Sequence, residues 1–174
     1  VEVVAQVYFE GETTLMSPAG RRAVFDKIRS FKPHVKLWWT GESQMEQGLR
    51  SGNVATGMYP HDVALLLSEE GFPVVSKFPK ECAFMNVGYY ACPSTSPFSE
   101  LAAKFIDFSL RPDIQRTFAQ KMKLSPLIGR ENAGLASEDF NLVATEGPIV
   151  RPASRAMVEK ASELQRMWQR TLTG

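Results

Sequence analysis

Hydroxyl-bearing and aromatic residues lie together where the chain is predicted to pass from a strand into a helix. Residues 34–40, HVKLWWT, alternate as a β-strand does, and a helix is predicted to begin directly after them. Thr40 and Ser43 lie at this junction, where α/β proteins expose hydroxyls and backbone N–H groups to bound ligands. The same residue types also serve as ordinary helix caps. Trp38 and Trp39 point to opposite faces of the strand, so either one of them faces a ligand cleft or both pack in the core.

Other residue types that bind metals or act as nucleophiles occur without the partners that such sites need. His34 and His61 have no second histidine or cysteine at metal-ligand spacing, so no metal site is predicted. Tyr89 and Tyr90 are adjacent, and paired phenolates can bind ferric iron, although no carboxylate or histidine motif accompanies them. Hydrolase elbows and glycine-rich nucleotide loops are absent, which predicts no enzyme and no cofactor.

Composition is that of an ordinary globular protein. The 174 residues are 44% hydrophobic and 22% charged, which argues against a disordered chain. The 20 Lys and Arg against 19 Asp and Glu give a net charge of +1, so no charge excess favours nucleic acid. The longest apolar run, residues 63–67, is too short to cross a membrane. Cys82 and Cys92 are expected to be buried free thiols rather than a disulfide.

Glycine and proline divide the chain into short alternating elements, a rhythm typical of α/β proteins. Residues 1–9 fit either a strand or a buried helix. Strands are predicted at 34–40, 52–58, 74–78 and 83–92, the last of them long for a globular strand. Helices are predicted to begin at or near Ser17, Gly41, Pro60, Ser96, Pro112 and Ser154. Residues 124–150 are expected to form an irregular connection.

The order of several segments resembles the C-terminal half of a type 2 solute-binding protein of an ABC importer, the class that includes polyamine, ferric and phosphonate binders. The matching segments are residues 32–58, 69–81 and 89–120. The most specific part is PKE at 79–81, then a strand, then an alanine-rich helix that ends in FIDF and is followed by LRPDIQ. The resemblance covers nearly the whole chain.

The resemblance implies an α/β fold in which two lobes hold the ligand between them. The chain is expected to form a periplasmic-binding-protein-like lobe of three layers (αβα), truncated so that most of the N-terminal lobe is missing. Residues 1–82 and 140–174 would build this second, C-terminal lobe. Residues 83–139 would supply a strand that crosses towards the first lobe and helices that pack on it.

The resemblance also implies which residues hold the ligand. In polyamine binders the strand after the PKE turn presents a Trp and an Asp, and these positions are Asn86 and Gly88 here. The missing Asp removes one charge-assisted contact with an ammonium group. Tyr59 lies at or beside the aromatic position that follows the Gly52 strand, and Glu2 matches an acidic residue of the opening helix. The expected ligand residues are Trp39, Thr40, Ser43, Tyr59, Asn86 and Tyr89, together with Glu2 and Glu81.

The expected function is that of the substrate-binding component of an ABC importer, located in the periplasm. It would capture a small polar solute, such as a polyamine or a phosphonate, and deliver it to a membrane permease without performing chemistry. One alternative is a ferric-ion-binding protein that uses Tyr89 and Tyr90. Another is a fragment that only self-associates, as a homodimer, through apolar surface on the helices at 97–121.

Overall fold

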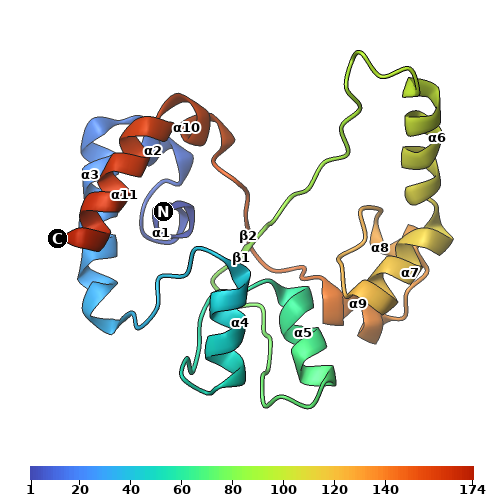
Figure 1. Cartoon of the computed structure of the whole chain (residues 1–174), viewed down its shortest axis with the longest axis horizontal. Helices are drawn as coiled ribbons and strands as arrows, with labels where there is room; N and C mark the ends of the chain where they lie inside the picture. Colours follow the sequence, from blue (N-terminus) through green and yellow to red (C-terminus); the bar gives the residue numbers. More distant parts are fainter. The chain divides into compact units, whose positions relative to one another are not determined.

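The computed structural model describes all 174 residues and divides them into two compact units (Figure 1). Unit 1 contains residues 1–41, 78–86 and 147–174, and unit 2 contains residues 42–77 and 87–146. The chain therefore passes from one unit to the other at residues 41–42, 77–78, 86–87 and 146–147.

Unit 1 consists of helices and one short parallel sheet. Its helices are α1 (Glu2–Tyr8), α2 (Glu12–Met16), α3 (Pro18–Phe31), the 3-10 helix η1 (Lys32–His34), α10 (Ser154–Glu159) and α11 (Ala161–Thr173). The sheet pairs β1 (Ala83–Phe84) with β2 (Ile149–Val150), in the register Ala83 to Ile149 and Phe84 to Val150. Local sequence sets the start of α3, because the Ser17 hydroxyl accepts the Gly20 N–H at 3.0 Å and proline occupies the first turn.

The hydrophobic core of unit 1 lies where α3 packs against α2 and α11. Val24, Phe25 and Ile28 recur at helical spacing and are fully buried on this face of α3. The other buried members of the cluster are Ala5, Leu15, Ala153, Ala156 and Leu164. A side chain at Gly20 would collide with the carbonyl of Thr14, so the close approach of α2 and α3 requires glycine there.

Unit 2 is helical, and its buried apolar residues are fewer and more scattered. Its helices are α4 (Glu42–Arg50), α5 (His61–Glu69), α6 (Ser99–Ser109), α7 (Pro112–Met122), α8 (Arg130–Ala133) and α9 (Ser137–Val143). The buried Gln115 amide joins two segments, because it donates to the carbonyl of Ser109 and accepts from the N–H of Leu127, both at 2.7 Å. Buried hydrogen bonds thus hold segments of this unit together in addition to its small hydrophobic core.

The predicted strands are mostly wrong. Residues 34–40, 52–58 and 74–78 form no strand, and of residues 83–92 only Ala83–Phe84 does. An alternating pattern favours extended backbone, but a strand also needs a hydrogen-bonded neighbour, and only β1 and β2 supply one to each other.

All the predicted helices are present, and their starts are confirmed except that of α6, which begins at Ser99 rather than at Ser96. Residues 1–9 are resolved in favour of a helix, and the last predicted helix is divided at Lys160 into α10 and α11. The expected connection at 124–150 contains α8, α9 and β2. The three-layer lobe stays a prediction, as does the division into residues 1–82 with 140–174 and residues 83–139, which concerns packing on a further lobe.

Both cysteines are free thiols, as expected, but only one of them is sheltered. Cys82 is partly buried, whereas Cys92 is exposed in the extended segment before α6, so the prediction that it is buried is wrong. The segment around Cys92 packs against little else, which explains its exposure. No helix of the chain is both long enough and apolar enough to span a bilayer.

Candidate functional site

The expected ligand residues are distributed over both units. Unit 1 holds Glu2, Trp39, Thr40, Glu81 and Asn86, and unit 2 holds Ser43, Tyr59 and Tyr89.

Two neighbouring cavities lie beside β2 in unit 1. The first, of about 280 Å³, lies between α1, α2 and the segment Ile149 to Ala153, and Glu2 lines it. The second, of about 320 Å³, is lined by Glu81 and Cys82. Gln6, Ile149 and Val150 line both cavities. The structure therefore places the two expected carboxylates, Glu2 and Glu81, at adjoining hollows of one unit.

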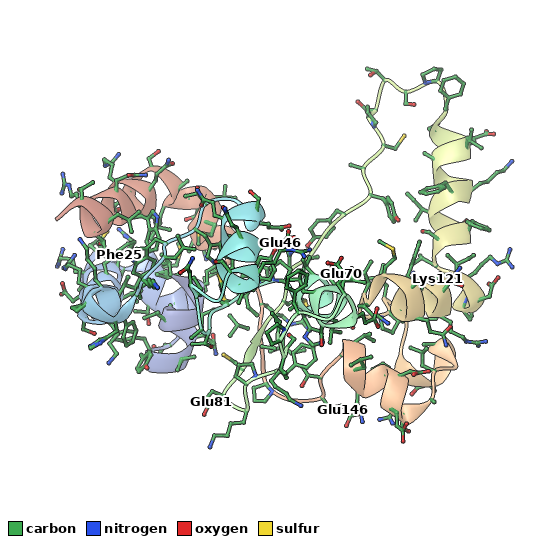
Figure 2. All side chains as sticks on the ribbon, turned by 60° about the horizontal axis from the view of Figure 1, so that its bottom comes forward. Phe25, Glu46, Glu70, Glu81, Lys121 and Glu146 are labelled. Carbon is green, nitrogen blue, oxygen red and sulfur yellow. The ribbon has the colours of Figure 1, made fainter.

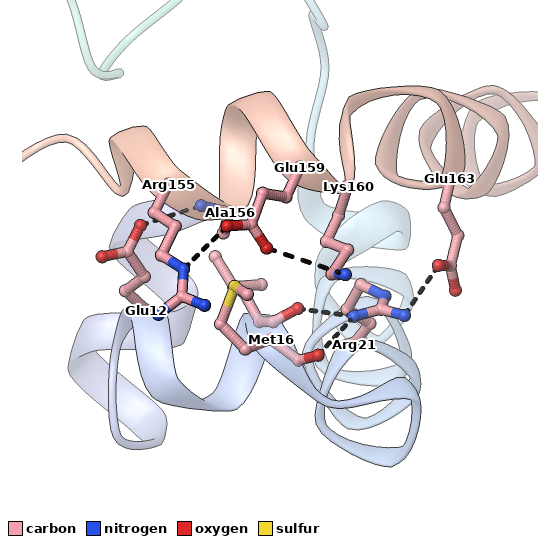
Figure 3. A network of polar contacts seen from close by, with 9 residues as sticks. Glu12, Met16, Arg21, Arg155, Ala156, Glu159, Lys160 and Glu163 are labelled. Carbon is pink, nitrogen blue, oxygen red and sulfur yellow. Dashed lines mark hydrogen bonds and ion pairs between the residues drawn. The ribbon is translucent and has the colours of Figure 1, made fainter.

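The first cavity is bordered by carboxylates that are anchored to the backbone. Glu2 accepts the Ala153 N–H at 2.6 Å. Glu12 accepts the Ala156 N–H at 2.9 Å, a contact that Figure 3 shows. These N–H groups belong to the start of α10, where the helix has no partner of its own for them and its dipole favours negative charge. One oxygen of each carboxylate is thus fixed by the fold. Sequence reasoning missed Glu12, because its partner lies 144 residues away and leaves no local signal.

A buried arginine holds the helices on one side of this cavity. Arg21 on α3 donates to the carbonyls of Leu15 and Met16, at 2.8 and 3.0 Å, and to the Glu163 carboxylate at 2.6 Å (Figure 3). It therefore satisfies the last carbonyls of α2 and ties both helices to α11. Sequence reasoning missed this residue too. The available signal was a charged residue at helical spacing from buried Val24, on the apolar face of α3.

Two of the three expected residues of unit 2, Ser43 and Tyr59, lie at the start of α4. The Tyr59 hydroxyl donates to the carbonyl of Glu42 at 3.2 Å, and the exposed Ser43 follows in the same helical turn. Burial raises the pKa of Tyr59, and the carboxylates of Glu46, Glu42 and Asp62 raise this pKa further. An aromatic ring in such an acidic setting is suited to a positively charged group.

The remaining expected residues lie at the surface. Tyr89 is 87% exposed and Asn86 is exposed as well, while Trp39 is half-buried. The ring of Tyr90 packs edge-on against Phe105, with 5.6 Å between centroids. No group of three or more histidine, cysteine, aspartate or glutamate side chains in the chain could together hold a metal ion.

Comparison with known proteins identifies a family and several relatives that this chain resembles. A family model described as bacterial extracellular solute-binding protein matches residues 3–140. The gamma-aminobutyric acid-binding protein of Pseudomonas aeruginosa is 26% identical over 113 residues, which are 65% of this chain and 31% of that protein. The spermidine/putrescine-binding periplasmic proteins of Escherichia coli and Salmonella typhimurium are 26% identical over 112 residues, which are 64% of this chain and 31% of theirs. The chain thus spans about a third of the length of these relatives. No solved structure matches it.

Proposed function

The chain belongs to the bacterial extracellular solute-binding protein family, and from this premise we propose that it is part of the solute-binding component of an ABC importer. It holds a small polar solute for a permease in the membrane, acts in the periplasm and performs no chemistry. The family match over residues 3–140 is the observation that carries this proposal. The named location of the spermidine/putrescine-binding relatives supports the periplasm.

The solute is a small molecule with at least one ammonium group. The relatives are named for gamma-aminobutyric acid and for spermidine and putrescine, which all carry at least one ammonium group. Their names refer neither to iron nor to phosphonates, so the amine class takes precedence over the ferric and phosphonate alternatives. The acidic surroundings of Tyr59 also support an ammonium group, because a carboxylate and an aromatic face both attract it.

Within this class, an amino acid with one ammonium group fits better than a polyamine. Asn86 stands where polyamine binders present an aromatic residue, and Gly88 where they present an aspartate, so at least one carboxylate is missing. A single ammonium group needs fewer carboxylates. The carboxylate of such a solute would be bound by the Ser43 hydroxyl in the first turn of α4. Trp39, Thr40, Asn86, Tyr89, Glu2 and Glu81 complete the proposed set of ligand residues.

We also propose how the chain is divided between the lobes of the binding protein. Residues 1–82 and 140–174 belong to a three-layer lobe, and residues 83–139 lie against the other lobe of the binding protein. Exposed apolar side chains at α6 support this. Phe98, which directly precedes α6, is 66% exposed, and Leu101 and Phe105 of α6 are 65% and 54% exposed. If size-exclusion chromatography with light scattering instead shows a dimer that Phe105→Lys dissociates, a second copy of the chain covers this face.

Thermal-shift measurement followed by calorimetry tests the proposed function. Gamma-aminobutyric acid, putrescine and spermidine are added to the chain, with methylphosphonate and ferric citrate as comparison solutes. A bound solute raises the Tm, by linkage, once its concentration exceeds its Kd. We expect a rise with at least one amine, lost in Tyr59→Ala and kept in Tyr8→Ala, which removes a tyrosine of unit 1. A rise with the phosphonate or the ferric salt alone, or no rise with any amine at millimolar concentration, contradicts the proposal.

A further inference from the structure

Helices α4 and α5 of unit 2 are joined at both of their ends. At one end, Tyr59, just ahead of α5, donates to the carbonyl of Glu42, the first residue of α4. At the other end, Arg50, the last residue of α4, donates to the Glu70 carboxylate at 2.8 Å. Glu70 directly follows α5 and is labelled beside that helix in Figure 2. The N-terminal ends of the two helices are therefore linked to each other, as are their C-terminal ends, so the helices run parallel.

Arg50 makes three contacts through its guanidinium group at this junction. Its Nε donates to Glu46 on α4 at 2.7 Å, while its Nη2 donates to Glu70. The carbon at the centre of the group lies 4.2 Å from the ring centroid of Phe72. Only a planar, forked cation can bond two carboxylates and stack on a ring at once, so lysine is a poor substitute.

The backbone after α5 is shaped to meet Arg50. Gly71 has a φ of +90°, a conformation that side-chain-bearing residues rarely adopt. The turn at Gly71 brings the Phe72 N–H back to the carbonyl of Leu67, at 3.1 Å. Phe72 is thereby held where the guanidinium stacks on it.

The segment between the two helices contacts α4 at two points. Gly57 lies against the side chain of Met45, which is 2% exposed on α4, because a first side-chain carbon at Gly57 would stand 2.5 Å from the terminal methyl carbon of Met45. Two residues later, the Tyr59 hydroxyl donates to the carbonyl of Glu42. The position of Tyr59 is therefore linked to that of α4.

From this geometry we infer that Arg50 is a positioning residue for the ligand site. It joins the C-terminal ends of α4 and α5. It thereby sets the relative position of Ser43 and Tyr59, which lie at the N-terminal ends of these helices. Arg50 lies about 10 Å along the helix axis from Ser43, so it acts without touching the solute. The inference rests on the proposed function, in which Ser43 and Tyr59 bind that solute.

The pKa of Tyr59 tests this inference. Loss of the Arg50 charge and displacement of Tyr59 would change this pKa in opposite directions. The positive charge of Arg50 lowers the pKa of Tyr59, while burial of the phenol raises it. Loss of the charge alone, in Arg50→Gln, would move this pKa further up. Separation of the helices would expose the phenol and move the pKa down, towards the ordinary value of about 10.

The experiment measures tyrosinate absorbance against pH, with Tyr59→Phe in each background to isolate the Tyr59 signal. We expect the Tyr59 midpoint to fall in Arg50→Gln and, less far, in Arg50→Lys, which keeps the charge but not the fork. We also expect calorimetry with gamma-aminobutyric acid and putrescine to show roughly tenfold weaker binding in Arg50→Gln, since small displacements of ligand groups are costly. Circular dichroism verifies that each variant is folded.

A matched control removes an ion pair of the same spacing that joins no second helix. Arg155 donates to Glu159 at 2.8 Å within α10 of unit 1, so Arg155→Gln should leave the Tyr59 midpoint and the affinity unchanged. A higher midpoint in Arg50→Gln with no change in Arg50→Lys overturns the inference, because charge then explains everything. An unaltered chain that binds neither amine overturns the proposed function, and the titration still decides whether Arg50 sets the position of Tyr59.

Discussion

Helix α3 of unit 1 buries its apolar face, whereas helix α6 of unit 2 leaves its apolar face in solvent. Val24 and Phe25 of α3 are 0% exposed, while Leu101 and Phe105 of α6 are 65% and 54% exposed. Both helices carry apolar residues at helical spacing, so this pattern alone does not separate them. The difference shows that amphipathic spacing determines which face of a helix is apolar. Distant parts of the chain determine whether that face is buried.

The polar contacts of the two regions differ in the same way. In unit 1, Arg21 reaches Glu163, and Lys32 donates to the carbonyl of Leu172 at 2.9 Å, across 140 residues of sequence. Around α6 the side-chain bonds are local, as from the Ser109 hydroxyl to the carbonyl of Ile106 at 2.7 Å. Regions with few buried contacts open at low free-energy cost, so α6 should be the less stable region.

Truncation of one phenylalanine in each helix should give the largest contrast. Phe25→Ala leaves a cavity in the core of unit 1 and should lower the free energy of unfolding by about 3–5 kcal/mol. Phe105→Ala removes a side chain that is already half in solvent and should cost less than about 1 kcal/mol. Guanidinium denaturation followed by circular dichroism measures both values. Equal losses would show that α6 is as well packed as α3.

Removal of the buried arginine of α3 should have the next largest effect. Arg21→Met leaves the carbonyls of Leu15 and Met16 without their donor and should cost about 1–3 kcal/mol. Its exposed neighbour provides the control, since Arg22→Met should change the free energy of unfolding by no more than about 0.5 kcal/mol. If both substitutions proved neutral, the long-range contact to Glu163 would not contribute to the stability of unit 1.

A smaller effect is expected where α2 caps α10. Glu12→Ala removes the acceptor of the Ala156 N–H and should cost about 1 kcal/mol, as the loss of a helix cap does. Glu12→Gln keeps an acceptor oxygen and should cost less. Hydrogen exchange at the Ala156 amide measures the effect locally. Unchanged protection in Glu12→Ala would show that this contact is not maintained in solution.

The smallest effect is expected in unit 2, in the pH dependence of the free energy of unfolding at alkaline pH. The pKa of Tyr59 is raised by burial, so above pH of about 10 the unfolded chain loses this proton before the folded chain does. The unfolded state then binds fewer protons, and stability falls as pH rises through this range. Tyr59→Phe should remove that part of the slope in denaturation curves collected between pH 9 and 11. An identical slope in the variant would contradict the burial of the phenol.

Features encoded by neighbouring residues could be predicted from the sequence, and features that need a distant partner could not. The start of α3 followed from Ser17 and the proline after it, because the capping hydroxyl and the N–H that donates to it lie within one turn. The strand expected at 34–40 failed because no second strand pairs with it. Glu2 and Glu81 were expected as ligand residues, and both line cavities, whereas Glu12 and Arg21 depend on contacts across more than 140 residues.

The path of the chain between the units has a consequence for how the protein is made. Residues 1–41 are synthesised before all of unit 2, but α10 and α11, which complete the core around Phe25, are synthesised only after it. The part of the apolar face of α3 that these helices cover therefore stays uncovered while unit 2 is synthesised. Contacts of such high sequence separation also form slowly, since a long loop must close before they contribute. Folding of unit 1 should thus follow synthesis rather than accompany it, and the nascent chain would depend on chaperones to keep it soluble.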